Sequence, residues 1–218
     1  MKHHQSGFTL IEIAIVLVII GLLLGGVLKG QELINSAKVK NLAGDFKNVP
    51  VFIYGYQDKF KALPGDETQA VLDTHFSPAN TATAATTGAT LSNGIINGNW
   101  NATTTASESF VFWQHIRLAG LAPGPTDTTT ADYIPKNAVG GAIGVTNAAS
   151  SPIIGLKGSY IVCSNGIAGK FAKQLDTTLD DGNTITGSMM VADLATSANP
   201  IATGTLVDDT PYTVCMGF

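Results

Sequence analysis

The chain has 218 residues and a net charge of −4, and only 13% of its residues are charged. This length is enough for one domain with its own core plus an appendage. The Lys and Arg residues are scattered, which argues against a nucleic-acid groove because phosphate binding needs clustered basic side chains.

Residues 8–28 form an apolar run whose single charge is Glu12. About 20 apolar helical residues span the hydrocarbon core of a bilayer. Lys2 precedes the run and marks the cytoplasmic side, so we expect the bulk of the chain to be exported. The run is longer than that of an ordinary secretory signal, and no A-x-A-like site follows it. A carboxylate inside such a helix is costly unless it is paired, which makes Glu12 a candidate functional residue.

The apolar run opens with the six residues Gly7-Phe8-Thr9-Leu10-Ile11-Glu12. This hexapeptide resembles the processing motif of type IV pilins and type II secretion pseudopilins. The resemblance implies a leader peptide (residues 1–7), cleavage between Gly7 and Phe8 by a membrane peptidase, and methylation of the new N-terminus at Phe8. It also implies that Thr9 and Glu12 serve assembly. The Glu12 carboxylate would pair with the Phe8 amine of a neighbouring subunit, since two buried opposite charges are tolerable only together.

After Lys29 the apolar residues recur mostly at steps of three and four, which predicts an amphipathic α-helix. The series is Leu33, Ala37, Leu42, Phe46, Val49, Ile53, Tyr56 and Phe60. We therefore expect one helix from residue 8 to about 60. It comprises a transmembrane or filament-core part (8–30) and an amphipathic part (31–62) that packs on a globular head. Pro50 is expected to bend it.

The head is predicted to comprise residues 63–218 and to begin at a turn, Leu63-Pro64-Gly65-Asp66. The stretch 74–107 is rich in Thr, Ala, Asn, Ser and Gly, and we expect a surface loop there that builds no core, with Trp100 packed on the head. A second helix is predicted over 107–121, with Ser107 as a candidate N-cap. Further expected elements are strands at 160–163 and 211–215 and a short helix at 167–175.

The chain has two cysteines, Cys163 and Cys215. An even number in a chain with an export signal predicts a disulfide, and two free thiols are the alternative. The bond would join the last strand to an earlier one. The expected fold class is α+β and pilin-like: a long N-terminal helix, half of it exposed and hydrophobic, packed on a small antiparallel β-sheet head with long loops.

Short pieces of the head also resemble one subgroup of pilin-like proteins, and no chemistry is assigned to them. They are Leu63-Pro64-Gly65-Asp66, Asn97-Gly98-Asn99, Glu108 with Trp113-Gln114-His115, Ala119-Gly120-Leu121, and Leu179-Asp180-Asp181-Gly182 with Thr186-Gly187.

An acidic cluster lies beside Gly182 and comprises Asp176, Asp180, Asp181 and Asn183. Calcium prefers such oxygen ligands on a flexible loop. The resemblance allows the same ion, because some pseudopilins bind calcium in a C-terminal loop. The spacing does not match an EF-hand, and a polar β-turn is the alternative. No other cofactor is expected.

The sequence contains no G-x-S-x-G, H-E-x-x-H or Walker motif and no G-x-G-x-x-G after a strand, so we do not expect an enzyme. The resemblance implies a pilin or minor pilin, a structural subunit of a type IV pilus-like filament. A type II secretion or competence pseudopilin is one alternative, and a membrane-anchored periplasmic binding protein is another. The implied partners are copies of the chain, the prepilin peptidase and the inner-membrane assembly platform. The implied location is the inner membrane before assembly and a periplasmic or extracellular filament afterwards.

Overall fold

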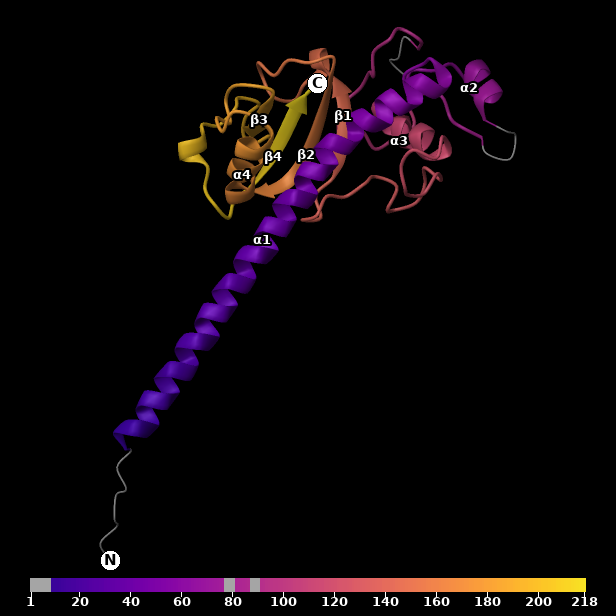
Figure 1. Cartoon of the computed structure of the whole chain (residues 1–218). Helices are drawn as coiled ribbons and strands as arrows, with labels where there is room; N and C mark the ends of the chain where they lie inside the picture. The colour runs from indigo at the N-terminus through magenta and orange to yellow at the C-terminus, as the bar shows by residue number, and fades with distance from the viewer. Residues whose placement is uncertain (1–8, 77–80, 87–90) are drawn as a thin grey trace, which may run out of the picture. The chain divides into compact units, whose positions relative to one another are not determined.

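The computed structural model describes residues 9–76, 81–86 and 91–218. In chain order its elements are α1 (Leu10–Phe60), α2 (Gln69–His75), α3 (Glu108–Leu118), β1 (Ile143–Asn147), β2 (Tyr160–Ala168), α4 (Gly169–Leu179), β3 (Met189–Ala192) and β4 (Pro211–Gly217) (Figure 1). Two short 3-10 helices lie at Ala148–Ser150 and Thr203–Thr205. The chain divides into two compact units, Met1–Lys38 and Val39–Phe218.

The first unit contains the N-terminal part of α1. Its described side chains are exposed from residue 9 to residue 29. The helix continues without interruption through Gly25, Gly26 and Gly30, so these glycines do not end it. An apolar helix with no buried face in the single chain requires a partner outside the chain, either lipid or protein.

The second unit contains the C-terminal part of α1, which is amphipathic as predicted. Its buried residues recur at three- and four-residue steps. They are Val39, Leu42, Ala43, Phe46, Val49, Pro50, Ile53 and Tyr56. The helix continues through Pro50 and ends at Phe60, where the sequence predicted its end.

The head contains a four-stranded antiparallel sheet with the strand order β1-β2-β4-β3. The strands expected at 160–163 and 211–215 are confirmed as β2 and β4, and both extend beyond the predicted ranges. The register of β2 against β4 shifts between Ser164 and Ile167, which marks a bulge. This layout confirms the expected α+β, pilin-like fold class.

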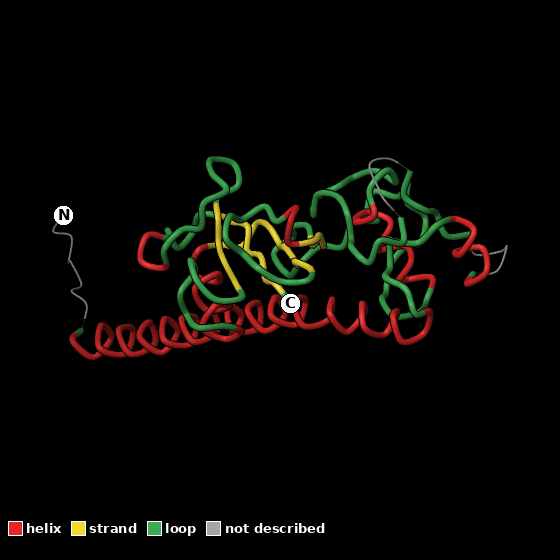
Figure 2. Tube along the Cα trace, turned by 90° about the horizontal axis from the view of Figure 1, so that it is seen from above, coloured by secondary structure: helices red, strands yellow, loops and turns green. Residues whose placement is uncertain are grey.

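Both faces of the sheet are buried, because alternate residues of each strand point to opposite sides. One face joins the large core, which includes residues of α1, α3 and α4. The part of α1 in the second unit runs along this face (Figures 1 and 2). The other face forms a second, smaller cluster. Its members are Trp100, Ile153, Leu156, Ile161, Cys163, Met190, Ala192 and Cys215.

The helices of the head differ in detail from the prediction. Helix α3 is confirmed, but the Ser107 side chain does not cap it: its hydroxyl lies 2.7 Å from that of Ser109. Helix α4 begins two residues later than expected and ends at Leu179. Neither α2, β1 nor β3 was predicted.

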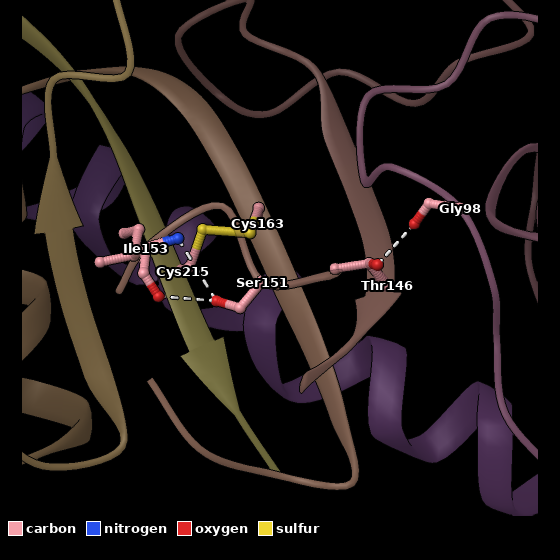
Figure 3. The surroundings of a disulfide bond; sticks show 6 residues. All are labelled: Gly98, Thr146, Ser151, Ile153, Cys163 and Cys215. Atoms are coloured by element: carbon pink, nitrogen blue, oxygen red, sulfur yellow. Dashed lines mark hydrogen bonds between the residues drawn. A yellow bond between two sulfur atoms is a disulfide. The ribbon is translucent and has the colours of Figure 1, made fainter. Parts of the chain in front are cut away.

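The prediction that residues 74–107 build no core was wrong. Ala82, Ala84, Ala85 and Ile96 belong to the large core, and Trp100 packs in the smaller cluster as expected. Hydrogen bonds to β1 hold this segment in place. Thr146 Oγ1 donates to the Gly98 carbonyl at 2.6 Å (Figure 3), and Asn147 Nδ2 donates to the Ile96 carbonyl at 2.9 Å. The polar composition concealed this burial because hydrogen bonds as well as apolar contacts fix the segment.

Candidate functional site

The polar residues of the head motifs bind backbone groups of distant segments. His115 on α3 accepts a hydrogen bond at Nδ1 from the Gly65 amide at 2.9 Å, and its Nε2 lies 3.0 Å from the Thr83 carbonyl oxygen. Because Nδ1 accepts, the ring carries its proton on Nε2 and donates to Thr83. Burial lowers the pKa of His115 to about 4, so the ring is neutral.

Gly65 is required at its position by the same arrangement. Its φ of 94° lies in the left-handed region, and a Cβ there would overlap the carbonyl oxygen of Glu108. The next residue, Asp66, accepts hydrogen bonds from the amides of Asn93 and Gly94 at 3.1 and 2.7 Å. The turn after α1 therefore holds residues 91–94 through one buried carboxylate.

Glu108 fixes the following part of the same segment. The carboxylate of this buried residue accepts a hydrogen bond from the Asn97 amide at 2.6 Å, and desolvation raises its pKa. Gly98 adopts a φ of 107°, and a Cβ there would overlap the Ser107 hydroxyl. Glu108 and His115 both bind backbone, so neither is presented as an acid or base to a substrate.

Sequence reasoning missed a buried polar group formed by Tyr56, Glu67 and His75. The Tyr56 hydroxyl donates to the Glu67 carboxylate, and His75 Nδ1 lies 2.8 Å from Glu67 Oε2. Desolvation raises the pKa of Glu67, whereas its two partners lower it. The only sequence signal was an acidic pair directly after a turn, which does not distinguish a buried carboxylate from a solvated one.

The two cysteines form the predicted disulfide. Cys163 on β2 and Cys215 on β4 are directly opposed in the antiparallel register, and both are fully buried. Figure 3 shows the bond on the face of the sheet that carries the smaller cluster, with Ile153 beside it. The Ser151 hydroxyl accepts a hydrogen bond from the Ile153 amide at 3.3 Å and donates one to the Ile153 carbonyl oxygen at 2.9 Å. These two hydrogen bonds form a tight turn beside the disulfide.

The first turn of α1 is closed by Thr9 and Glu12. The amide and hydroxyl of Thr9 donate to Glu12 Oε2 at 2.8 and 2.7 Å, and the Glu12 amide lies 3.3 Å from the Thr9 hydroxyl oxygen. This reciprocal pair is a capping box, in which two side chains bind the free amides of a helix start. Both Thr9 donors use Oε2, so among the described residues Oε1 remains available for a second donor.

Helix α1 is long and apolar enough to cross a membrane by its length and composition, and its most apolar window has no buried residue. It is the one such helix among the described residues. A signal sequence near the N-terminus would pass the same test. The predicted processing residues, Gly7 and Phe8, lie outside the described residues.

Residues 2–28 match the family described as the prokaryotic N-terminal methylation motif. The chain carries this motif. The match spans the predicted cleavage position, the capping pair and the apolar part of α1, and it supports a type IV pilin-like or pseudopilin protein. Comparisons with curated proteins and with solved structures gave no match.

The acidic cluster brings together three of its four predicted members. Carboxylate oxygens of Asp176, Asp180 and Asp181 lie within 4.8 Å of one another. Asn183 joins them through its backbone, because its amide donates to Asp181 Oδ1 at 2.8 Å. The calcium prediction remains a prediction.

Proposed function

We propose that the chain is a structural subunit, a pilin or minor pilin, of a type IV pilus-like filament. A membrane peptidase cleaves it after Gly7 and methylates Phe8. The observation that carries the proposal is the methylation motif over residues 2–28, which runs directly into the exposed apolar part of α1. A motif for N-terminal processing joined to a helix without a buried face fits a subunit whose helix is buried only after assembly.

In this proposal Glu12 has one role before assembly and another as the filament grows. Before assembly, Thr9 supplies donors to the carboxylate, which lowers the cost of holding it in an apolar helix. Cleavage then creates an amine at Phe8. The amine of a neighbouring subunit binds Glu12 as the filament grows, and each buried charge compensates the other.

The head forms the outer coat of the filament in this proposal. Its disulfide suits an oxidising compartment outside the cytoplasm. The chain therefore resides in the inner membrane before assembly and in a periplasmic or extracellular filament afterwards. Its partners are further copies of itself, the prepilin peptidase and the assembly platform.

One feature favours a pseudopilin as the second candidate. Many type IV pilins, by the resemblance, have a proline where this chain has Lys29, and α1 continues without interruption through this residue. Lys29 keeps the backbone hydrogen bond that a proline at this position would remove from the helix. Electron microscopy of filaments purified from the producing cells distinguishes a surface pilus from a short periplasmic pseudopilus.

The test of processing is the mass of the mature chain. The chain from its native membrane should lack residues 1–7 and carry one methyl group on Phe8. Gly7→Trp should accumulate uncleaved, because a bulky residue blocks the peptidase, whereas Gly7→Ala serves as the conservative control. A wild-type chain that keeps Met1 or an unmethylated N-terminus would contradict the proposal and favour a membrane-anchored binding protein.

A further inference from the structure

Two adjoining cavities of the head lie beside the last turns of α1. The larger has a volume of about 570 Å³ and the smaller has a volume of about 220 Å³. Gln57, Leu63 and Gly94 line both cavities, so we treat the two as one site and call it the α1 groove. The larger cavity has the size of a small-molecule binding site.

The charged side chains that line the α1 groove already have partners. Asp66 is buried, and its two carboxylate oxygens accept hydrogen bonds from the amides of Asn93 and Gly94. The Lys61 ammonium donates to the backbone carbonyl and to the carboxylate of Asp58. Because both charges are engaged within the chain, the lining favours a neutral ligand over a charged one.

The uncharged polar side chains of the groove are not engaged in this way. Gln57 is half-buried, and its side-chain amide, which can donate two hydrogen bonds and accept two, makes none with the described residues. The hydroxyls of Ser92 and Ser159, one in each cavity, also make no hydrogen bond within the described parts of the chain. The groove therefore offers donors and acceptors to a ligand that carries several hydroxyl groups.

The smaller cavity adds an aromatic and apolar wall. Tyr54 on α1 is 59% exposed, and its ring meets that of buried Tyr160 edge-on, with centroids 6.3 Å apart and an angle of 72° between the planes. Ile95 lines the same cavity and is partly exposed. A tyrosine held by a neighbouring ring presents a rigid apolar surface at low entropic cost. This wall suits a ring with an apolar C–H face.

The backbone of the larger cavity is fixed without a ligand. Lys61 and Ser92 line it, and they are the two non-glycine residues with positive φ in the described parts of the chain, at 56° and 61°. The Lys61 amide donates to the Gln57 carbonyl at 2.9 Å, and the Ser92 amide donates to the Asp66 carbonyl at 2.8 Å. Such conformations persist only where the surroundings hold them. A preformed wall reduces the ordering cost of binding.

We propose that the α1 groove binds a short neutral oligosaccharide. A sugar ring combines an apolar C–H face, which packs on Tyr54, with hydroxyl groups at its edge, which bind the amide of Gln57 and the hydroxyls of Ser92 and Ser159. The ligand carries no charge, because the groove has no free charge to pair with it. This proposal does not depend on filament assembly.

The test is saturation-transfer NMR on the full-length chain in micelles of a detergent without a sugar headgroup. The probes are lactose, maltotriose, cellotriose and triacetylchitotriose, each at up to about 10 mM, well above a millimolar dissociation constant. At least one of these sugars should receive saturation, mainly at the C–H protons of one ring face. No transfer to any of them would overturn the proposal. Tighter binding of the anionic sialyllactose than of lactose would overturn the choice of a neutral ligand.

The same sugars attached to a solid surface distinguish two sources of the ligand. Retention of the protein on an immobilised sugar supports a glycan displayed on a cell surface. Binding in solution without retention supports a free oligosaccharide. Neither binding nor retention would contradict the proposal.

Variants locate the site. Gln57→Ala should weaken binding about three- to tenfold, because it removes uncharged hydrogen bonds to the ligand. The matched control is Gln174→Ala, since Gln174 is an exposed glutamine on α4, outside the groove. Tyr54→Ala should also weaken binding, whereas Tyr54→Phe keeps the ring and should bind nearly as the wild type does. Wild-type affinity in both alanine variants of the groove, or equal weakening in Gln174→Ala, would overturn the assignment.

Discussion

Three buried polar side chains of the head, Asp66, Glu108 and His115, bind the backbone of segments far away in the sequence. Each satisfies an amide that regular secondary structure leaves unpaired. At the scale of the residue, the head motifs are therefore explained by loop anchoring. A stretch rich in Thr, Ala and Asn acquires a defined course because a few side chains bind its amides.

The contribution of His115 to the stability of the fold is expected to depend on pH. Burial lowers the pKa of His115 to about 4, whereas an unfolded histidine titrates near about 6.5. Between these values the unfolded state binds more protons, so this residue's contribution to stability is present above pH 6.5 and is lost as the pH falls toward 4. The loss is on the order of 3 kcal/mol.

Urea unfolding of the wild type and His115→Gln across this pH range measures that contribution. The raised pKa values of Glu67 and Glu108 act in the opposite direction, so the difference between the two proteins is the relevant quantity. We expect the wild type's advantage over His115→Gln to shrink as the pH falls. A constant difference would show that His115 is not titrating as a buried neutral ring.

At the scale of the element, the sheet is stabilised from both faces. The α1 face carries the large core, and the opposite face carries the disulfide and a small apolar cluster. The smaller cluster has few members, so it supplies less hydrophobic stabilisation than the core. The Cys163–Cys215 bond compensates by linking the central strands β2 and β4 across a separation of 52 residues.

Removing the disulfide should therefore destabilise the head measurably. The chain-entropy relation gives about 4 kcal/mol for a loop of this length, and engineered removals commonly cost less. We expect the double variant Cys163→Ala/Cys215→Ala to lose about 2–4 kcal/mol of unfolding free energy in urea. Reductant should lower the wild type to the same level and leave the double variant unchanged. A loss below about 1 kcal/mol would mean that the bond contributes little.

At the scale of the whole molecule, the two units differ in whether they bury their own apolar side chains. The second unit has its own core. The described apolar side chains of the first unit are exposed, and only lipid or further protein can cover them. An insertion-competent helix joined to a stable head is the organisation that the proposed filament subunit needs.

Assembly is predicted to depend on the charge of Glu12 rather than on its capping alone. Glu12→Ala should be processed normally but form no filaments, as judged by electron microscopy. Glu12→Gln is the matched control, because a glutamine at this position still accepts the Thr9 hydrogen bonds but carries no charge. It should also fail to assemble. Normal filaments from Glu12→Gln would show that the cap suffices and that pairing with the Phe8 amine is not required.

The sequence by itself determined the features that local pattern encodes. Apolar run length, helical periodicity and the hexapeptide at Gly7–Glu12 predicted a helix that ends at about residue 60, the methylation motif and the fold class. These depend on neighbours along the chain, so no distant contact was needed to find them. The disulfide also followed, since a chain with two cysteines allows only one pairing.

Only the tertiary structure decided the features that depend on contacts between residues far apart in the sequence. Strands β1 and β3 are short, and their place in the sheet comes from pairing with β2 and β4. Burial of Ile96 likewise arises from segments remote in sequence. The burial of Asp176 at the end of α4 also depends on the fold, because the sequence pattern of this acidic stretch predicts a polar turn.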